Sequence, residues 1–93
     1  MDRVRAHIFI FGRVQGVFFR SHAKETAQSF GLVGWVRNNP DGTVEILAEG
    51  SKEKLEGFIK WCREGPLFAK VEKTEVEWEK ANREFDSFEI LYE

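Results

Sequence analysis

Hydrophobic and polar side chains alternate near the start of the chain, with a period of two over residues 4–11. This alternation predicts a β-strand with one buried face, because neighbouring side chains of a strand point to opposite sides of the sheet. The even positions form the face that we expect in the core, namely Val4, Ala6, Ile8 and Ile10. The odd positions form the opposite face, namely Arg5, His7, Phe9 and Phe11.

The apolar spacing then changes to that of helices. Over residues 20–31 the apolar positions recur every three or four residues, and Gly31 is a natural C-terminal stop. A second helix is predicted over residues 52–64, with Ser51 as its N-cap. Its apolar stripe follows the spacing of one helix face and consists of Leu55, Phe58, Ile59 and Cys62.

The rest of the pattern predicts further strands over residues 32–38, 43–49, 70–79 and 86–91. Pro40-Asp41-Gly42 is the expected turn between the first two of these strands. The order is β-α-β-β-α-β, with the short strand 86–91 at the end. Right-handed crossovers place both helices on one face of a mostly antiparallel sheet. We therefore predict an α+β fold, a ferredoxin-like α/β sandwich with a largely open second face, as one domain over residues 1–93.

The segment that joins the first strand to the first helix, residues 12–20, reads G-R-V-Q-G-V-F-F-R. Its two glycines allow backbone conformations that a Cβ forbids, so that successive N–H groups can point into one concavity. The helix N-terminus adds unpaired donors and a partial positive charge, which suits an anion such as phosphate. Arg20 is placed to add a planar, bidentate clamp. Taken alone, however, such a glycine loop is also a common strand-to-helix connector.

This segment, together with G-W-V-R-N-N-P-D-G-T-V at residues 34–44, resembles the two signature blocks of the acylphosphatases. The resemblance covers essentially the whole chain and implies the ferredoxin-like fold independently. It also implies an enzyme that hydrolyses the carboxyl-phosphate anhydride of a small-molecule acylphosphate to a carboxylate and inorganic phosphate. The family needs no metal and no other cofactor for this reaction.

The resemblance assigns roles to the matching positions. Arg20 corresponds to the arginine that binds the substrate's phosphate group. Asn38 corresponds to the asparagine that orients the attacking water, although composition alone would make it an ordinary turn residue. The family implies that phosphate oxygens are held by loop backbone amides, those of Val14, Gln15, Gly16, Val17, Phe18 and Phe19. Its chemistry suggests the substrate's own phosphate as the proton acceptor.

The other reactive side chains are predicted to be structural or solvated. His7 and His22, with a single cysteine, give no metal-ligand spacing. Cys62 lies on the apolar stripe of the second helix and is expected to be a core thiol. Asn39 is assigned to the turn that follows Asn38. The glutamates of the fourth strand are expected to face solvent, namely Glu72, Glu75, Glu77 and Glu79.

Charge and composition narrow the possible partners. The net charge of −2 argues against general nucleic-acid binding, which usually requires a basic surface. No apolar run approaches the ~20 residues that span a membrane. The single cysteine allows no internal disulfide, and the charged N-terminus does not resemble a signal peptide. We therefore expect a cytoplasmic monomer that contacts neither nucleic acid nor membrane.

Two alternative functions remain open at this stage. RNA-recognition domains share this element order, and Phe9 and Phe11 lie on the face where such domains stack bases. The aromatic strand that these domains also need is absent, because residues 43–48 contain no Phe or Tyr. The stronger alternative is a non-enzymatic, phosphate-binding accessory domain like those at the start of hydrogenase-maturation proteins. Such domains belong to much longer chains, whereas this sequence ends at Glu93.

Overall fold

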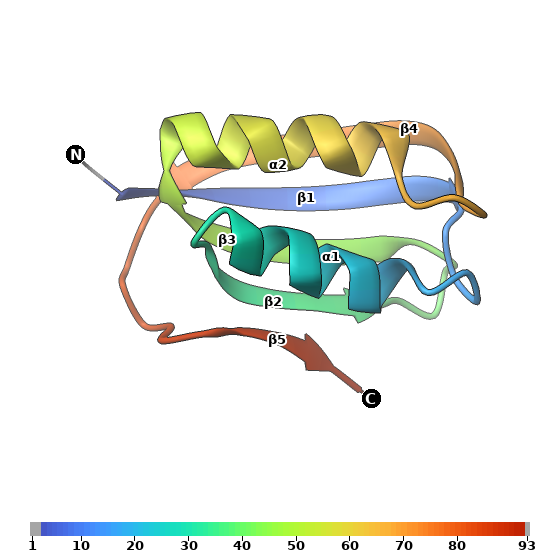
Figure 1. Cartoon of the computed structure of the whole chain (residues 1–93), viewed down its shortest axis with the longest axis horizontal. Helices are drawn as coiled ribbons and strands as arrows, with labels where there is room; N and C mark the ends of the chain where they lie inside the picture. Colours follow the sequence, from blue (N-terminus) through green and yellow to red (C-terminus); the bar gives the residue numbers. More distant parts are fainter. Residues whose placement is uncertain (1–2, 93) are drawn as a thin grey trace.

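The computed structural model describes residues 3–92, in which two helices pack on one five-stranded sheet (Figure 1). In chain order the elements are β1 (Arg3–Arg13), α1 (Phe19–Ser29), β2 (Val33–Asn38), β3 (Val44–Ser51), α2 (Lys52–Glu64), β4 (Lys70–Lys80) and β5 (Phe88–Leu91). Met1, Asp2 and Glu93, which entered the expectations about the N-terminus and the domain ends, lie outside the described residues.

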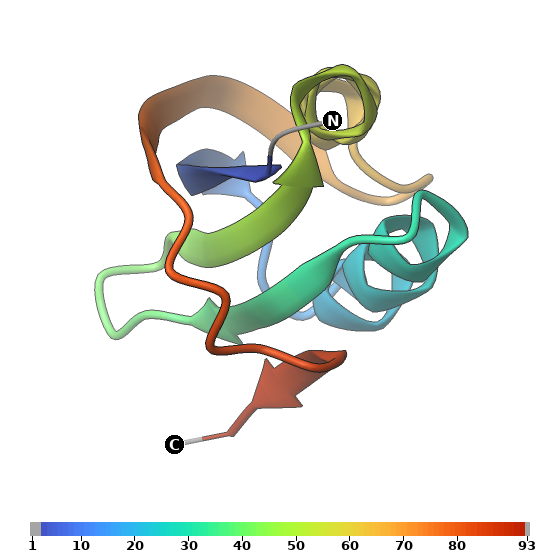
Figure 2. The ribbon, with the colours of Figure 1, turned by 90° about the vertical axis from the view of Figure 1, so that its left-hand side faces the viewer.

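The strand order across the sheet is β4-β1-β3-β2-β5. Three of the neighbouring pairs are antiparallel, and only β2 and β5 run parallel. Both helices lie on the same face of the sheet, as the end view in Figure 2 shows. The structure therefore confirms the ferredoxin-like sandwich and the mostly antiparallel sheet. No helix within residues 3–92 is both long enough and apolar enough to cross a membrane.

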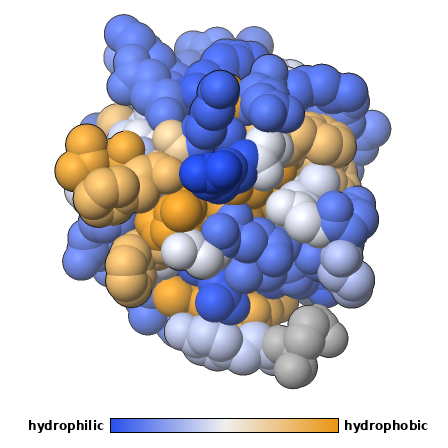
Figure 3. All heavy atoms as spheres, turned by 90° about the vertical axis from the view of Figure 1, so that its right-hand side faces the viewer, coloured by the Kyte–Doolittle hydropathy of each residue, from blue (hydrophilic) through white to orange (hydrophobic). Residues whose placement is uncertain are grey.

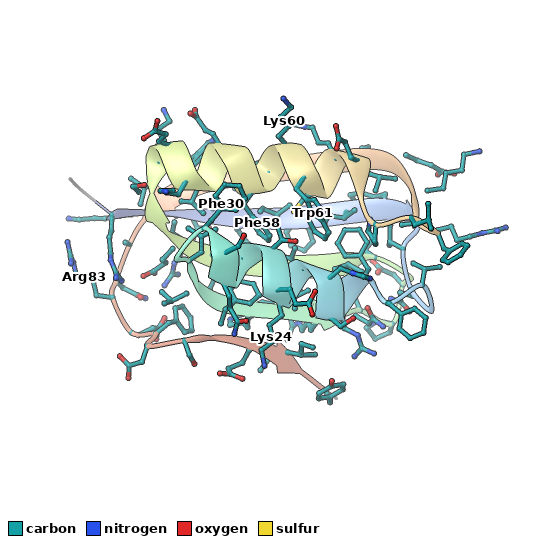
Figure 4. The ribbon with its side chains drawn as sticks, viewed as in Figure 1. Lys24, Phe30, Phe58, Lys60, Trp61 and Arg83 are labelled. Carbon is teal, nitrogen blue, oxygen red and sulfur yellow. The ribbon has the colours of Figure 1, made fainter. Side chains whose placement is uncertain are left out.

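The core lies between the sheet and the helices, where the alternation of β1 predicts it. Ala6, Ile8 and Ile10 are fully buried, and Val4 packs against the edge of the same cluster. Helix α1 contributes Phe19, Ala23 and Ala27, and α2 contributes the predicted stripe of Leu55, Phe58, Ile59 and Cys62. Figure 4 shows Phe30, Phe58 and Trp61 in the space between the two helices. Fully burying one large apolar side chain contributes about 1.5–3 kcal/mol, so this cluster holds the two layers together.

One predicted break in the sheet is wrong. The third strand was predicted to end at residue 49, but β3 continues through Gly50 to Ser51. Gly50 pairs with Val4 of β1, and a Cβ at this position would lie 2.4 Å from Cδ2 of Leu32. A side chain here would require Leu32 to shift, so Gly50 serves close packing inside a continuous strand. Ser51 still caps α2 as predicted, because its hydroxyl accepts a hydrogen bond from the N–H of Lys54.

Other boundaries differ by only one to three residues. β1 runs on to Arg13 with an irregular register between Phe11 and Gly12, whereas the pattern had ended it at residue 11. β5 begins at Phe88 instead of residue 86. Helix α1 spans 19–29 rather than 20–31, so the chain leaves the helix just before the predicted stop.

Candidate active site

A pocket of about 290 Å³ opens at the end of the sheet where β1 leads into residues 14–18, which we call the cradle loop. The structure brings Arg20 and Asn38, predicted from separate sequence blocks, into this one pocket. The complete lining consists of Val14, Gly16, Phe18, Phe19, Arg20, Ser21, Asn38, Ile90 and Tyr92. Figure 3 shows this end of the molecule, where blue polar groups lie beside orange apolar ones.

The cradle loop has an unusual backbone. Gly16 has a φ of 75°, with open space where a side chain would stand. Phe18 also adopts the left-handed conformation, with φ 62° and ψ 26°, which costs a non-glycine residue about 1–2 kcal/mol. The carbonyl of Phe18 accepts hydrogen bonds from the Ser21 hydroxyl at 3.1 Å and from the His22 N–H at 3.2 Å. These bonds hold the strained residue at the start of α1.

The backbone donors of this loop are unpaired. Within residues 3–92, no acceptor receives a hydrogen bond from the backbone N–H groups of residues 15–21. The start of α1 also has no side-chain cap and no acidic residue in its first turn. Most helices have a capping side chain or an acidic residue at their N-terminus. An N-terminus without either, beside a loop of free N–H donors, leaves room for an external anion.

Asn38 stands at the last position of β2 with its side chain in the same pocket. Its Oδ1 atom is buried and has no hydrogen-bond partner among the described residues. Leaving a buried acceptor unpaired costs about 1–3 kcal/mol. Such an atom is therefore a marker of a site whose partner is a water or a ligand.

Arg20 is half-buried and is the one charged residue that lines the pocket within the described chain. Its guanidinium carbon lies 5.0 Å from the centre of the Tyr92 ring, a cation–π contact that positions the group. None of the ion pairs found among residues 3–92 involves Arg20. The pocket consequently carries an uncompensated positive charge.

Gln15 fastens the cradle loop to the turn between β2 and β3. Its Nε2 donates hydrogen bonds to the carbonyl oxygens of Asn39, at 2.8 Å, and Thr43, at 2.9 Å. Asn39 in turn donates from Nδ2 to Oγ1 of Thr43 at 3.0 Å, which confirms its assignment to the turn. This link sets the position of the loop relative to Asn38. The side chain of Gln15 does not line the pocket, and Val17 lines a neighbouring groove instead.

Sequence reasoning missed three residues of the pocket, namely Ser21, Ile90 and Tyr92. Two of them lie in or just after β5, which reaches the site by parallel pairing with β2. No local pattern indicates such a long-range pairing, so the short strand gave no signal of its role.

The remaining reactive groups are mostly placed as predicted. Cys62 is buried in the core, where burial raises the pKa of its thiol. The glutamates expected to be solvated on β4 are all exposed: Glu72, Glu75, Glu77 and Glu79.

His7 is not simply solvated. Its Nε2 lies 2.6 Å from Oε2 of Glu45, and potential ligand atoms of His7, Glu77 and Glu79 lie within 4.8 Å of one another. The linear sequence did not show this grouping because the residues come from neighbouring strands. The grouping lies on the open face of the sheet, outside the pocket.

Glu45 is a carboxylate on the same open face, 6% exposed. Burial raises its pKa, but hydrogen bonds from His7 and Arg37 outweigh this effect and hold the pKa of Glu45 below its usual value. The open face therefore carries paired charges, in contrast to the unpaired Arg20.

Comparisons with known proteins agree with this geometry. The family model for acylphosphatase matches residues 6–90. An acylphosphatase from Pelotomaculum thermopropionicum is 45% identical over 92 residues, which cover 99% of this chain and 100% of that protein. The crystal structure of an acylphosphatase from Bacillus subtilis has a TM-score of 0.92 at 38% identity, covering 96% of this chain and 99% of its own.

The same fold also occurs inside a longer protein. Full-length HypF in a phosphate- and nucleotide-bound form matches with a TM-score of 0.87 and 31% identity. The match covers 99% of this chain but only 12% of HypF. The match to the family model and the full-length similarity to acylphosphatases confirm the prediction from the two sequence blocks: this chain belongs to the acylphosphatase family, whose activity is acylphosphate hydrolysis.

Proposed function

We propose that this protein hydrolyses an acylphosphate by direct, metal-independent attack of water on phosphorus. The single observation that carries the proposal is that Asn38, whose buried Oδ1 has no partner among the described residues, lines one pocket with Arg20 and with the cradle loop, whose amide donors are free. The buried acceptor can orient a water, and the free cation and the open amides can hold a phosphate and stabilise the charge of the transition state.

The phosphate would be held by the backbone amides of Val14 to Phe19 and by the guanidinium of Arg20. Charge in phosphoryl transfer spreads over the three equatorial oxygens, and donors fixed in advance stabilise that charge without having to reorganise. The absence of any carboxylate from the described pocket lining favours this binding, because no negative charge competes with the substrate.

The water would be oriented by Asn38. In this proposal its Oδ1 accepts a hydrogen bond from one O–H of the water, so that an oxygen lone pair of the water faces phosphorus. As the new O–P bond forms, the bond from phosphorus to the acyl oxygen breaks, and its electron pair leaves with the carboxylate. The described lining contains no histidine or carboxylate to act as a base, so the water proton passes to a phosphate oxygen of the substrate.

A metal is not needed in this scheme. Carboxylate is already a good leaving group, and Arg20 with the amide donors supplies the positive charge that Mg²⁺ gives to other phosphoryl transfers. The described lining also offers no carboxylate, histidine or cysteine that would hold a divalent cation.

The direct test is the hydrolysis of benzoyl phosphate, followed by absorbance, in the presence of excess EDTA. We expect turnover at the same rate with and without the chelator. When the reaction is run in ¹⁸O-labelled water, the label should enter inorganic phosphate and not benzoate. Label in benzoate would place the attack on the acyl carbon and contradict the role of Asn38.

The second candidate is a phosphate-binding accessory domain, favoured by the match to HypF, whose crystal structure has phosphate bound. Binding of inorganic phosphate without turnover of any acylphosphate would support it over the enzyme. An RNA-binding role is disfavoured, because the open face carries the carboxylates of Glu45, Glu75 and Glu77 beside Phe9. We propose that the protein acts as a cytoplasmic monomer.

A further inference from the structure

A second hollow, of about 390 Å³, adjoins the active-site pocket, and Phe18 lines both. We call it the side groove. It is lined by Val17, Phe18, His22, Thr26, Trp61, Pro66, Leu67 and Phe68. Its volume lies within the range of about 300–1,000 Å³ that small-molecule sites usually have. Because Phe18 lines both hollows, they are neighbours at this end of the molecule.

The rim of the side groove exposes large apolar side chains. Leu67, Phe18 and Phe68 are 87%, 74% and 72% exposed. Figure 3 shows hydrophobic side chains gathered on one side of this end of the molecule. Such an exposed apolar patch beside a pocket is a feature of binding sites, because each of these side chains gains free energy when a ligand covers it.

The side groove is floored by Trp61, which packs against aromatic rings of the core. Trp61 of α2 is half-buried, with its ring 5.4 Å from that of Phe19 and stacked on that of Phe58 at 6.0 Å. Figure 4 shows Trp61 beside Phe58 between the helices. An aromatic floor fixed by the core provides a flat surface that is already in place before a ligand binds, which lowers the entropic cost of binding.

Phe18 is the element that links the two hollows. Its left-handed backbone, which glycine would adopt without strain, carries an exposed phenyl ring instead. A strained residue at a functional site suggests a role for its side chain that offsets the cost. Here the exposed side chain of Phe18 borders both the phosphate pocket and the apolar groove.

We infer that the side groove is a binding site for the acyl group, and that the substrates it favours are acylphosphates with an uncharged aromatic or long aliphatic acyl group. The inference rests on the proposed function for its chemistry. Among the described lining residues there is no lysine, arginine or carboxylate, and His22 and Thr26 are the polar ones, so the lining favours an uncharged acyl group over a charged one. The acyl chain would lie over Trp61 and under Leu67 and Phe68.

The test uses the double variant Leu67→Ser and Phe68→Ser, whose two side chains lie on the surface and outside the core cluster. Wild type and variant are compared for kcat/KM with benzoyl phosphate and with acetyl phosphate. We expect the benzoyl-to-acetyl ratio to fall roughly fivefold to tenfold, because apolar pocket contacts of this size discriminate on about that scale. The kcat/KM for acetyl phosphate should change less than about twofold in the double variant, since the methyl group is too short to reach the groove. Trp78→Ser, which removes an exposed tryptophan from β4, is the matched control and should leave the ratio unchanged.

A binding measurement separates failure of the groove from failure of the enzyme. Phenacylphosphonate and acetonylphosphonate are stable analogues of benzoyl and acetyl phosphate, and their Kd values can be measured by calorimetry. The wild type should bind the phenacyl compound more tightly, and the double variant should lose that preference. If no acylphosphate is turned over but this preference is present, the proposed function is wrong and the apolar site stands.

Two results would overturn the inference. One is an equal affinity of the wild type for the two phosphonates together with an unchanged benzoyl-to-acetyl ratio in the double variant. The other is a dimer in sedimentation that becomes a monomer on the double substitution while the ratio stays the same. That outcome would assign the apolar rim to a second copy of the chain and not to the acyl group.

Discussion

Buried polar groups are unpaired at one end of the sheet and hydrogen-bonded at the other. At the end that carries the cradle loop, Asn38 has a buried oxygen without a partner, and the N–H groups of residues 15–21 are unpaired. At the other end, the carboxylate of Glu49 is completely buried and fully paired. It accepts hydrogen bonds from Arg5 at 2.9 Å and from the backbone N–H groups of Asn82 and Arg83 at 3.2 Å each. Figure 4 shows Arg83 at the end away from the cradle loop.

The difference separates a structural polar site from one prepared for a ligand. Glu49 ties residues 82–83 to β3, and those residues lead into β5, which brings Ile90 and Tyr92 to the pocket. The pairing of Glu49 therefore stabilises its end of the sheet, whereas the open groups around Asn38 cost stability at the other end. We expect substitutions at the two ends to have opposite effects on folding and on activity.

The largest expected effect is that of Arg20→Ala. It removes the one charged residue of the described pocket lining, and arginine clamps on transferring phosphoryl groups contribute about 10³-fold or more. We expect kcat for benzoyl phosphate to fall at least ~10³-fold, with little change in the free energy of unfolding because Arg20 has no ion-pair partner within residues 3–92. The control is Arg3→Ala, an exposed arginine at the start of β1, which should stay within about twofold of wild type. Near-normal turnover in Arg20→Ala would remove Arg20 from the mechanism.

Asn38→Ala should separate activity from stability. We expect kcat to fall about 10²-fold to 10³-fold, as for the loss of other transition-state hydrogen bonds, with the Kd for inorganic phosphate nearly unchanged. Thermal unfolding should occur at the same or a slightly higher temperature, because the substitution removes a buried unpaired oxygen.

Asn39→Ala is the matched control for this variant, and it should behave in the opposite way. Its Nδ2 donates to Thr43, so its loss should lower stability by about 1 kcal/mol and affect kcat less. A loss of phosphate binding in Asn38→Ala, with kcat preserved at saturation, would contradict the water-orienting role.

Glu49→Gln should damage folding rather than chemistry. The amide cannot accept all the donors that face the carboxylate, and Arg5 is left without its buried counter-charge. We expect the free energy of unfolding to fall by about 2–3 kcal/mol in urea denaturation, while kcat of the folded fraction stays close to wild type. Glu79→Gln is the control, because that partly exposed carboxylate contacts the same Arg5 at 3.6 Å and should matter by less than about 0.5 kcal/mol.

The smallest expected effect concerns Glu45 and pH. Because the folded-state pKa of Glu45 is lowered, its ionised form stabilises the protein above the ordinary value of 4.5, and this contribution disappears as the pH falls through the folded-state pKa. Glu45→Gln should therefore lose less stability than wild type between about pH 6 and pH 3. Urea denaturation across this range measures the difference. Glu75→Gln, an exposed change on β4, should keep the acid dependence of wild type, and the same flattening there would contradict a specific role for Glu45.

Local patterns were sufficient for the fold. The period-two face of β1 and the apolar stripe of α2 both became core, because the alternation of apolar residues dictates which face is buried. The two sequence blocks also identified Arg20 and Asn38 as members of one pocket, and the structure brings both residues there. Their roles in the reaction stay predictions.

What the sequence could not predict depends on contacts between distant segments. Tyr92 reaches Arg20 only through the parallel pairing of β5 with β2, which leaves no local signal. No local pattern indicates that the carboxylate of Glu49 is covered by Arg5 and by the segment after β4. The sequence likewise gives no signal of the left-handed backbone of Phe18, because a bulky residue rarely adopts that conformation.

The central claim is that the unpaired amides of the cradle loop and Arg20 form the phosphate site. Titration of the ¹⁵N-labelled protein with inorganic phosphate tests it directly, because each backbone N–H reports its own hydrogen bonding. We predict that the largest, saturable shifts fall on the amides of residues 14–20, and that they are abolished in Arg20→Ala. Shifts that cluster instead on the open face around His7, or that persist unchanged in Arg20→Ala, would contradict the account.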